Sequence, residues 1–130
     1  LKLINFNMQN YLNSEEMDMM NNIVTQMSYS HVKENGYPNL ENYNLAFHIV
    51  READLLAAYD VERCFVYKMK NEKNSYETTY PDVISLFENR ILKYIDDDLF
   101  ITEYSKSKAR NLHDNAIIRL DEIKKINSLF

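Results

Sequence analysis

An aspartate in the middle of the chain is the residue best placed to do chemistry. Asp54 stands in the run EADLLAA, among small and apolar residues. An ionised carboxylate in such a setting is costly unless it is paired, hydrogen-bonded or bound to a cation. The sequence therefore predicts a buried Asp54 that has a partner. On a helix of 3.6 residues per turn, the residues that share its face are Tyr43, Phe47, Val50 and Ala57.

Three explanations for Asp54 are open. It could form a structural salt link with Arg51 or Arg63. It could accept hydrogen bonds from a tyrosine or from a helix end. It could also bind a metal whose other ligands lie elsewhere. Structural ion pairs account for many buried carboxylates, so residue chemistry alone favours the first two explanations over the third.

Two histidines stand close to acidic residues. His48 and Glu52 are four residues apart, a spacing that can place two ligands on one metal. They project away from Asp54, so we expect a surface contact between them. His113 and Asp114 form a His-Asp dipeptide, but they follow Asp54 in the chain. We interpret this dipeptide as the polar shoulder of a C-terminal helix.

Length and composition predict one helical domain over residues 1–130. Hydrophobic residues make up 45% of the chain and charged residues 27%, an ordinary balance for a globular protein. Hairpins and tight turns depend on glycine and proline, and the chain has one glycine and two prolines. The expected fold class is therefore all-α, with helices joined by polar loops.

Charge and cysteine content restrict the partners and the compartment. The net charge of −5 repels phosphate backbones, so we expect no nucleic-acid partner. Lys106, Lys108 and Arg110 are interpreted as a solvated helix face. No apolar run is long enough to span a bilayer, so we expect no membrane partner. Cys64, the single cysteine, is interpreted as a buried structural thiol in a reducing compartment, which indicates a cytoplasmic protein. The many Asn, Lys, Ile and Tyr residues are typical of an AT-rich genome, such as those of some large DNA viruses.

Local signals predict where the helices begin. Asn13 and Glu16 have the spacing of a capping box. Thr79 can cap a helix that has Pro81 in its first turn. The acidic run 96–98 is interpreted as a solvated loop that caps the next helix, because hard-cation ligands at loop spacing are missing. The expected helices cover residues 1–12, 13–26 (or as far as 29), 40–59, 61–70, 79–94 and 103–127, with loops at 34–39 and 71–75.

Several spaced features resemble a known family. Residues 27–30 read MSYS, residues 36–38 read GYP, and residues 49–59 read IVREADLLAAY, followed by Arg63. In this order they resemble the later part of HD-domain metal-dependent phosphohydrolases. That resemblance implies an all-helical, HD-like bundle. It also implies that Asp54 is the distant Asp of the family motif, a ligand of a divalent metal such as Mn, Fe or Mg.

The rest of the family motif has no counterpart in this chain. The family places a first His and a His-Asp dipeptide upstream of the distant Asp, and neither His31 nor His48 is followed by Asp. Some members have a further His where this chain has Met27. We therefore expect a domain that is incomplete before Leu1, with the missing ligands on an N-terminal segment or a partner chain.

Two functions follow as expectations. The resemblance implies an HD-type phosphohydrolase, or a fragment of one, that acts on a nucleotide or another small phosphate ester and is inactive as this chain alone. Arg63 or a nearby lysine would then stabilise the phosphate, while the catalytic residues and the substrate stay unidentified. The alternative is a non-enzymatic, HD-like helical interaction or structural module that binds no metal and contacts a partner chain.

Overall fold

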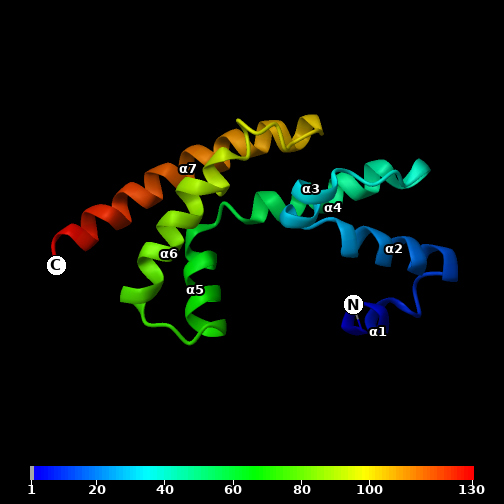
Figure 1. The fold of residues 1–130 in the computed structure, drawn as a ribbon, viewed down its shortest axis with the longest axis horizontal. Coiled ribbons are helices and arrows are strands. Elements are labelled where there is room, and N and C mark those ends of the chain that lie inside the picture. Colours follow the sequence, from blue (N-terminus) through cyan, green and yellow to red (C-terminus); the bar gives the residue numbers. More distant parts are fainter. Residues whose placement is uncertain (1) are drawn as a thin grey trace. The chain divides into compact units, whose positions relative to one another are not determined.

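A computed structural model describes residues 2–130, and this part of the chain consists of helices and connecting loops without a strand (Figure 1). The all-α prediction is therefore confirmed. The helices are α1 (Lys2–Met8), α2 (Ser14–Gln26), α3 (Tyr29–Asn35), α4 (Asn44–Ala57), α5 (Val61–Asn71), α6 (Tyr76–Asn89) and α7 (Glu103–Ser128), with short 3-10 helices η1 (Glu41–Tyr43) and η2 (Ile91–Lys93).

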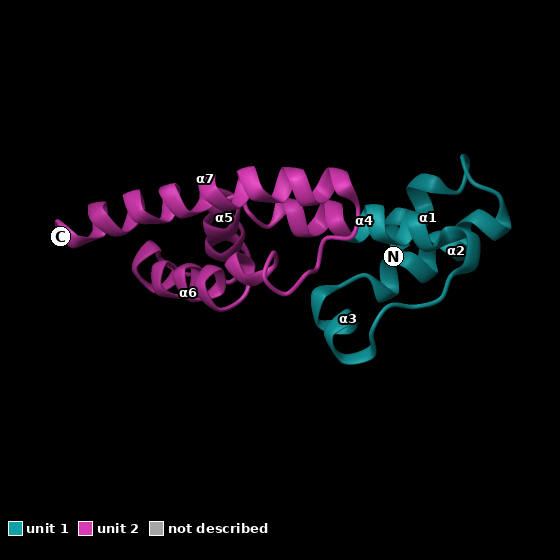
Figure 2. Ribbon diagram, turned by 90° about the horizontal axis from the view of Figure 1, so that it is seen from above, with its two compact units in different colours: residues 1–51 teal, residues 52–130 magenta. Residues whose placement is uncertain are grey.

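The contacts divide the chain into two compact units (Figure 2). The first unit comprises Leu1–Arg51 and the second comprises Glu52–Phe130, so the division falls inside α4. A single domain over residues 1–130 stays a prediction. None of the described helices combines the length and the apolar character that a membrane crossing requires.

Side-chain caps begin most of the helices. The capping box of α2 is present: the Asn13 side chain accepts from the Glu16 N–H at 2.8 Å, and the Glu16 carboxylate accepts from the Asn13 N–H at 2.9 Å. Each bond satisfies a backbone donor that the first turn of a helix leaves without a partner. The predicted helices over 61–70 and 103–127 also correspond closely to α5 and α7.

The predicted start of α6 was wrong. The helix begins at Tyr76, because Ser75 caps it through the Thr78 N–H. Thr79 lies within the first turns and is fully buried, and Pro81 lies inside the helix. Both Ser75 and Thr79 have side chains that can cap a helix. The sequence alone does not indicate which of the two is buried in the core.

The second unit has an aromatic core. Tyr59, Tyr94 and Phe100 pack with ring centroids 5.9–6.4 Å apart, and each is at most 3% exposed. Val83 and Phe87 of α6 are fully buried, and α6 lies beside α5 (Figure 1). Each such side chain contributes about 1.5–3 kcal/mol through burial, so this core is a main source of stability for the second unit.

Candidate functional site

Asp54 is exposed, and the prediction that it lies on a buried face was wrong. Within α4 the buried residues are Phe47, Arg51, Glu52 and Leu55. The buried face is thus rotated by roughly a quarter turn from the one that the helical wheel suggested. Among the described residues, no side-chain hydrogen bond or ion pair involves Asp54, and a carboxylate in water needs none.

The metal role of Asp54 stays a prediction. An exposed carboxylate with uncommitted oxygens is a suitable ligand for a hard divalent cation, so this residue fits the role on its own. Within residues 2–130, however, no three His, Cys, Asp or Glu side chains are grouped closely enough to hold a metal ion. The described part of the chain therefore contains no complete metal centre.

Glu52 is the buried carboxylate of this helix, and it is fully enclosed. The prediction that Glu52 lies on the surface beside His48 was wrong about the surface position. Its Oε1 accepts from the Ile101 N–H at 2.6 Å, and its Oε2 accepts from the Thr102 hydroxyl at 2.6 Å. The Thr102 N–H also donates to Glu52, at 3.2 Å. Glu52 thus binds the N-terminus of α7, where backbone donors and the helix dipole favour negative charge.

The hydrogen bonds keep Glu52 ionised. Burial raises the pKa of its carboxyl group, because the charged form loses water. Hydrogen bonds from Thr102, Ile101 and Ser105 lower the pKa by more than burial raises it, so the group titrates below its ordinary range. A charged acceptor makes these bonds stronger than neutral ones. This arrangement is structural, and it occupies both carboxylate oxygens.

Arg51 is the other buried charge of α4, at 2% exposure. Its guanidinium donates to His48 Nδ1 at 3.2 Å and lies 4.9 Å from the centre of the Tyr37 ring. The proposed salt link between Arg51 and Asp54 is not among these contacts. Stacking on an aromatic ring suits the planar, weakly hydrated guanidinium.

The His113-Asp114 dipeptide lies on α7, with the His113 side chain half-buried and the Asp114 side chain exposed. The Nε2 of His113 lies 3.2 Å from the Leu92 carbonyl oxygen, and Nδ1 lies 3.5 Å from the Asp114 carboxylate. The ring of His113 packs edge-on against Tyr59, with centroids 6.1 Å apart. The ring therefore joins the aromatic core, and its nitrogens face groups of the protein itself.

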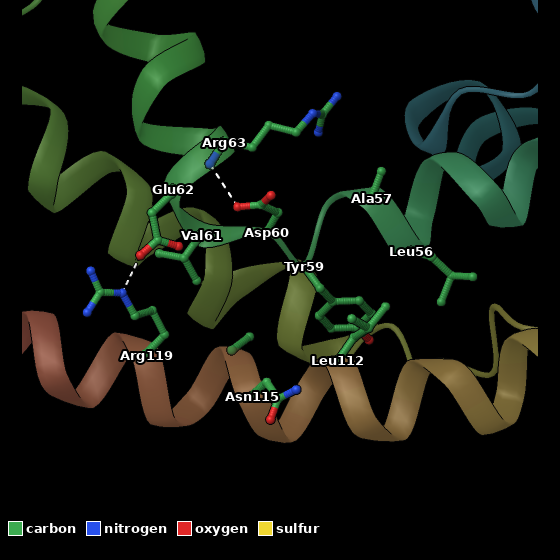
Figure 3. Close-up of a pocket in the computed structure, with 11 residues that line it drawn as sticks. Leu56, Ala57, Tyr59, Asp60, Val61, Glu62, Arg63, Leu112, Asn115 and Arg119 are labelled. Carbon is green, nitrogen blue, oxygen red and sulfur yellow. Dashed lines mark hydrogen bonds and ion pairs between the residues drawn. The ribbon is translucent and has the colours of Figure 1, made fainter.

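A hollow of about 460 Å³ lies where the start of α5 faces α7 (Figure 3). Its apolar lining includes Leu56, Val61 and Leu112. Glu62 and Arg119 form an ion pair at one end, which Figure 3 shows as a dashed line. The volume lies within the usual range for small-molecule pockets, and most of the exposed lining surface is apolar.

Arg63 lines this hollow without pointing across it. Its backbone N–H donates to the Asp60 carboxylate at 3.0 Å, which caps α5. Its exposed side chain extends away from Arg119 in Figure 3. The expected role of Arg63 in binding phosphate stays a prediction, since the side chain is accessible from solvent.

An apolar groove continues beyond the Glu62–Arg119 pair. It has a volume of about 260 Å³ and lies between α5 and α7. Val66 is 64% exposed there, and Ile126 is 51% exposed. The apolar side chains that line this groove are Phe65, Val66, Tyr76, Ile123 and Ile126.

Cys64 is half-buried, so the expected buried thiol is partly exposed. Its Sγ lies 3.6 Å from the Ala58 carbonyl oxygen. Burial raises the pKa of the thiol, and the positive charge of Arg63 offsets only part of that effect. Since the thiolate is the reactive form, these surroundings favour a structural thiol.

The burial of Glu52 and its bonds to a distant segment could not be predicted from the sequence. Its partners Ile101 and Thr102 lie about fifty residues away along the chain. Thr102 followed by Glu103 is a readable capping signal for α7. No local pattern indicates which distant carboxylate will reach that cap.

No protein-family model, no curated protein and no solved structure matches this chain.

Proposed function

We propose that this chain is part of an HD-type, metal-dependent phosphohydrolase and that Asp54 binds its divalent metal. One observation carries the proposal: Asp54 has an exposed carboxylate without a protein partner among the described residues, in the helical segment that resembles the family's distant Asp. The oxygens of Asp54 are accessible to a cation, whereas those of Glu52 accept hydrogen bonds within the fold.

The proposal gives the two carboxylates of α4 different roles. Glu52 is fully buried and bonded to α7, whereas Asp54 keeps its oxygens accessible. A bound divalent metal supplies positive charge to a phosphoryl group and makes a nearby water molecule more acidic. Asp54 would hold that charge, and Arg63, which is also exposed, would attract the phosphate.

The remaining ligands must come from outside the described residues, on another segment or a partner chain. Substrates would be small phosphate esters, such as nucleotides. The HD-like arrangement of the bundle is part of the same proposal, as is a cytoplasmic location.

The test is to measure metal content and phosphatase activity in the full-length protein that carries this sequence. We expect stoichiometric Mn or Fe and hydrolysis of a nucleoside monophosphate that stops when the metal is removed by a chelator. A metal-free protein that neither binds Mn²⁺ nor hydrolyses phosphate esters would contradict the proposal.

A second function has its own supporting observation. The apolar groove between α5 and α7, with Val66 and Ile126 largely exposed, favours a non-enzymatic helical module that contacts another protein. This function predicts a stable complex that is weakened by Val66→Asp and the absence of bound metal. Stoichiometric manganese or iron in the purified protein would count against it.

A further inference from the structure

Side chains at seven-residue spacing follow the side of α7 that borders the hollow and the groove. Leu112, Arg119 and Ile126 stand seven residues apart. Asn115 and Glu122 lie between them at the same interval. Residues at these steps share one side of a helix, so the five form a single stripe about 21 Å long, which we call the α7 seam. Such spacing is typical of a helix that packs along a second helix at a shallow angle.

The two ends of the α7 seam lie beside exposed apolar surface. Leu112 lines the hollow of about 460 Å³, and Ile126 lines the groove of about 260 Å³. Across the groove, Val66 of α5 is 64% exposed, and Met69 follows three residues later at 38%. Apolar surface that continues over two helices marks a contact with another molecule.

The centre of the α7 seam carries both signs of charge. Arg119 donates from Nε to Glu62, as Figure 3 shows, and from Nη1 to Glu122 at 3.0 Å. These bonds use two of the five N–H donors of the guanidinium, so donors remain for a carboxylate of a second molecule. The three side chains are 42–56% exposed and can therefore be reached from solvent.

We propose that the α7 seam binds the α7 seam of a second copy of this chain, with the two helices antiparallel and crossing at Arg119. Leu112 then lies against Ile126 of the second copy at both ends, because the two residues are equally far from Arg119. Charge decides the orientation. Parallel helices would set each Glu122 against its own counterpart, whereas antiparallel helices place Glu122 beside the Asn115 amide and the guanidinium of the other copy.

A second copy fits this surface because the surface contains its own complement. A twofold contact requires the same patch on both molecules, with apolar groups meeting apolar groups and each charge meeting its opposite. Apolar ends placed equally on either side of an arginine between two glutamates meet that requirement. The proposal uses only residues of the second unit and goes beyond the proposed function, since it needs no metal.

The experiment is sedimentation equilibrium of the full-length protein over a wide range of concentration, with a reducing agent because Cys64 is partly exposed. Arg119→Glu leaves only carboxylates at the centre of the α7 seam. Glu62→Lys combined with Glu122→Lys leaves only cations there. The replaced side chains are largely exposed, so the fold should tolerate both changes, and circular dichroism checks that each variant is folded.

We expect wild type to form a dimer. Each charge variant alone should dimerise at least about tenfold more weakly, because like charges then meet at the centre. An equimolar mixture of the two charge variants should form a heterodimer, since an acidic centre meets a basic one.

An isoleucine pair on α7 supplies the matched control. Ile126→Asp should also weaken the dimer at least about tenfold. Ile117 stands nine residues before Ile126, so it projects from the opposite side of α7, and it is 38% exposed. Ile117→Asp should dimerise like wild type.

Disulfide formation tests the antiparallel orientation. In a Cys64→Ser background, Leu112→Cys and Ile126→Cys proteins that are mixed and oxidised should link to each other. Neither should link to itself, because the two copies place position 112 beside position 126 and far from position 112.

A wild type that stays monomeric at every concentration would overturn the proposal, including one that binds a different protein through this groove. A dimer that Arg119→Glu and Ile126→Asp leave unchanged would overturn it too, because the copies would then meet elsewhere. So would a mixture of the two charge variants that stays monomeric, or a disulfide within Leu112→Cys alone. Metal is absent from all of these samples, so the proposed function can fail without affecting the result.

Discussion

The carboxylate of Glu52 accepts a hydrogen bond of 2.6 Å from the hydroxyl group of Thr102, fifty residues further along the chain. The same carboxylate accepts from the Ile101 N–H, so one side chain of α4 binds the two residues that come just before α7. This relationship explains why two neighbouring carboxylates differ: Glu52 is enclosed and Asp54 is exposed.

Replacing Glu52 should destabilise the protein. In Glu52→Gln the side chain keeps its size but loses its charge, and its amide group cannot accept from every donor at the start of α7. We expect the free energy of unfolding to fall by about 1.5–3 kcal/mol, the range for hydrogen bonds to charged groups. Urea denaturation followed by circular dichroism measures the change.

A surface carboxylate provides the control for that substitution. Glu88 accepts from Lys124 at 2.7 Å, but both side chains are largely exposed. We expect Glu88→Gln to change stability by no more than about 0.5 kcal/mol. Equal effects of Glu52→Gln and Glu88→Gln would show that the buried link to Thr102 contributes no more than a surface ion pair.

Stability should depend on pH through Glu52. Its pKa is lowered in the folded protein, because the hydrogen bonds outweigh the effect of burial. A lowered folded-state pKa stabilises the protein above the unfolded-state pKa, about 4.3 for Glu, and this contribution disappears as the pH falls through the folded-state value. Denaturation curves between pH 7 and pH 3 should therefore bring wild type and Glu52→Gln closer together as the solution becomes acidic. A difference that grows on acidification would reverse the sign of the proposed shift.

Tyr59 should tolerate the loss of its hydroxyl group. The residue is 3% exposed, and within residues 2–130 its hydroxyl oxygen has no hydrogen-bond partner. Burial is the main cause that raises the pKa of Tyr59, so the group stays neutral. Because Tyr59→Phe removes a buried polar group that makes no bond, we expect equal or greater stability, by up to about 1 kcal/mol.

Tyr94→Phe is the comparison for Tyr59→Phe. Tyr94 is similarly buried, but its hydroxyl oxygen accepts from Arg90 Nε at 3.3 Å. We expect this variant to lose about 0.5–1.5 kcal/mol. Thermal unfolding of both variants decides the matter, and a larger loss for Tyr59→Phe than for Tyr94→Phe would mean that Tyr59 has a partner, such as an ordered water.

Structural features that depend on contacts between near neighbours in the chain were predicted correctly. Features that depend on contacts with distant residues were not. Asn13 and Glu16 defined the start of α2 correctly, because a capping box is a contact across three residues. The prediction of which face of α4 is buried was wrong, because alanines and leucines extend around much of this helix. Which side of α4 packs inward depends on residues elsewhere in the chain, such as Thr102. The periodicity of α4 contains no information about those residues.

The candidate site could be predicted only as a single residue. Asp54 was found by its contrast with an apolar run, yet that contrast pointed to burial, and the structure places it in solvent. A carboxylate stands out in a sequence whether or not it is enclosed. The carboxylate that is enclosed, Glu52, did not stand out, because it lies beside Arg51 and Ala53 in a pattern that is also typical of a surface position.

The Mn²⁺ affinity of Asp54→Asn shows whether Asp54 is a ligand of a divalent metal. The full-length protein, Asp54→Asn and Asp82→Asn would be titrated with Mn²⁺ in a calorimeter. Asp82 is the matched control, since it is also an exposed aspartate within a helix. We expect one site in wild type and in Asp82→Asn, and at least about tenfold weaker binding in Asp54→Asn, since a charged ligand is lost. Binding by Asp54→Asn that equals wild type, or no binding by wild type, would contradict this expectation.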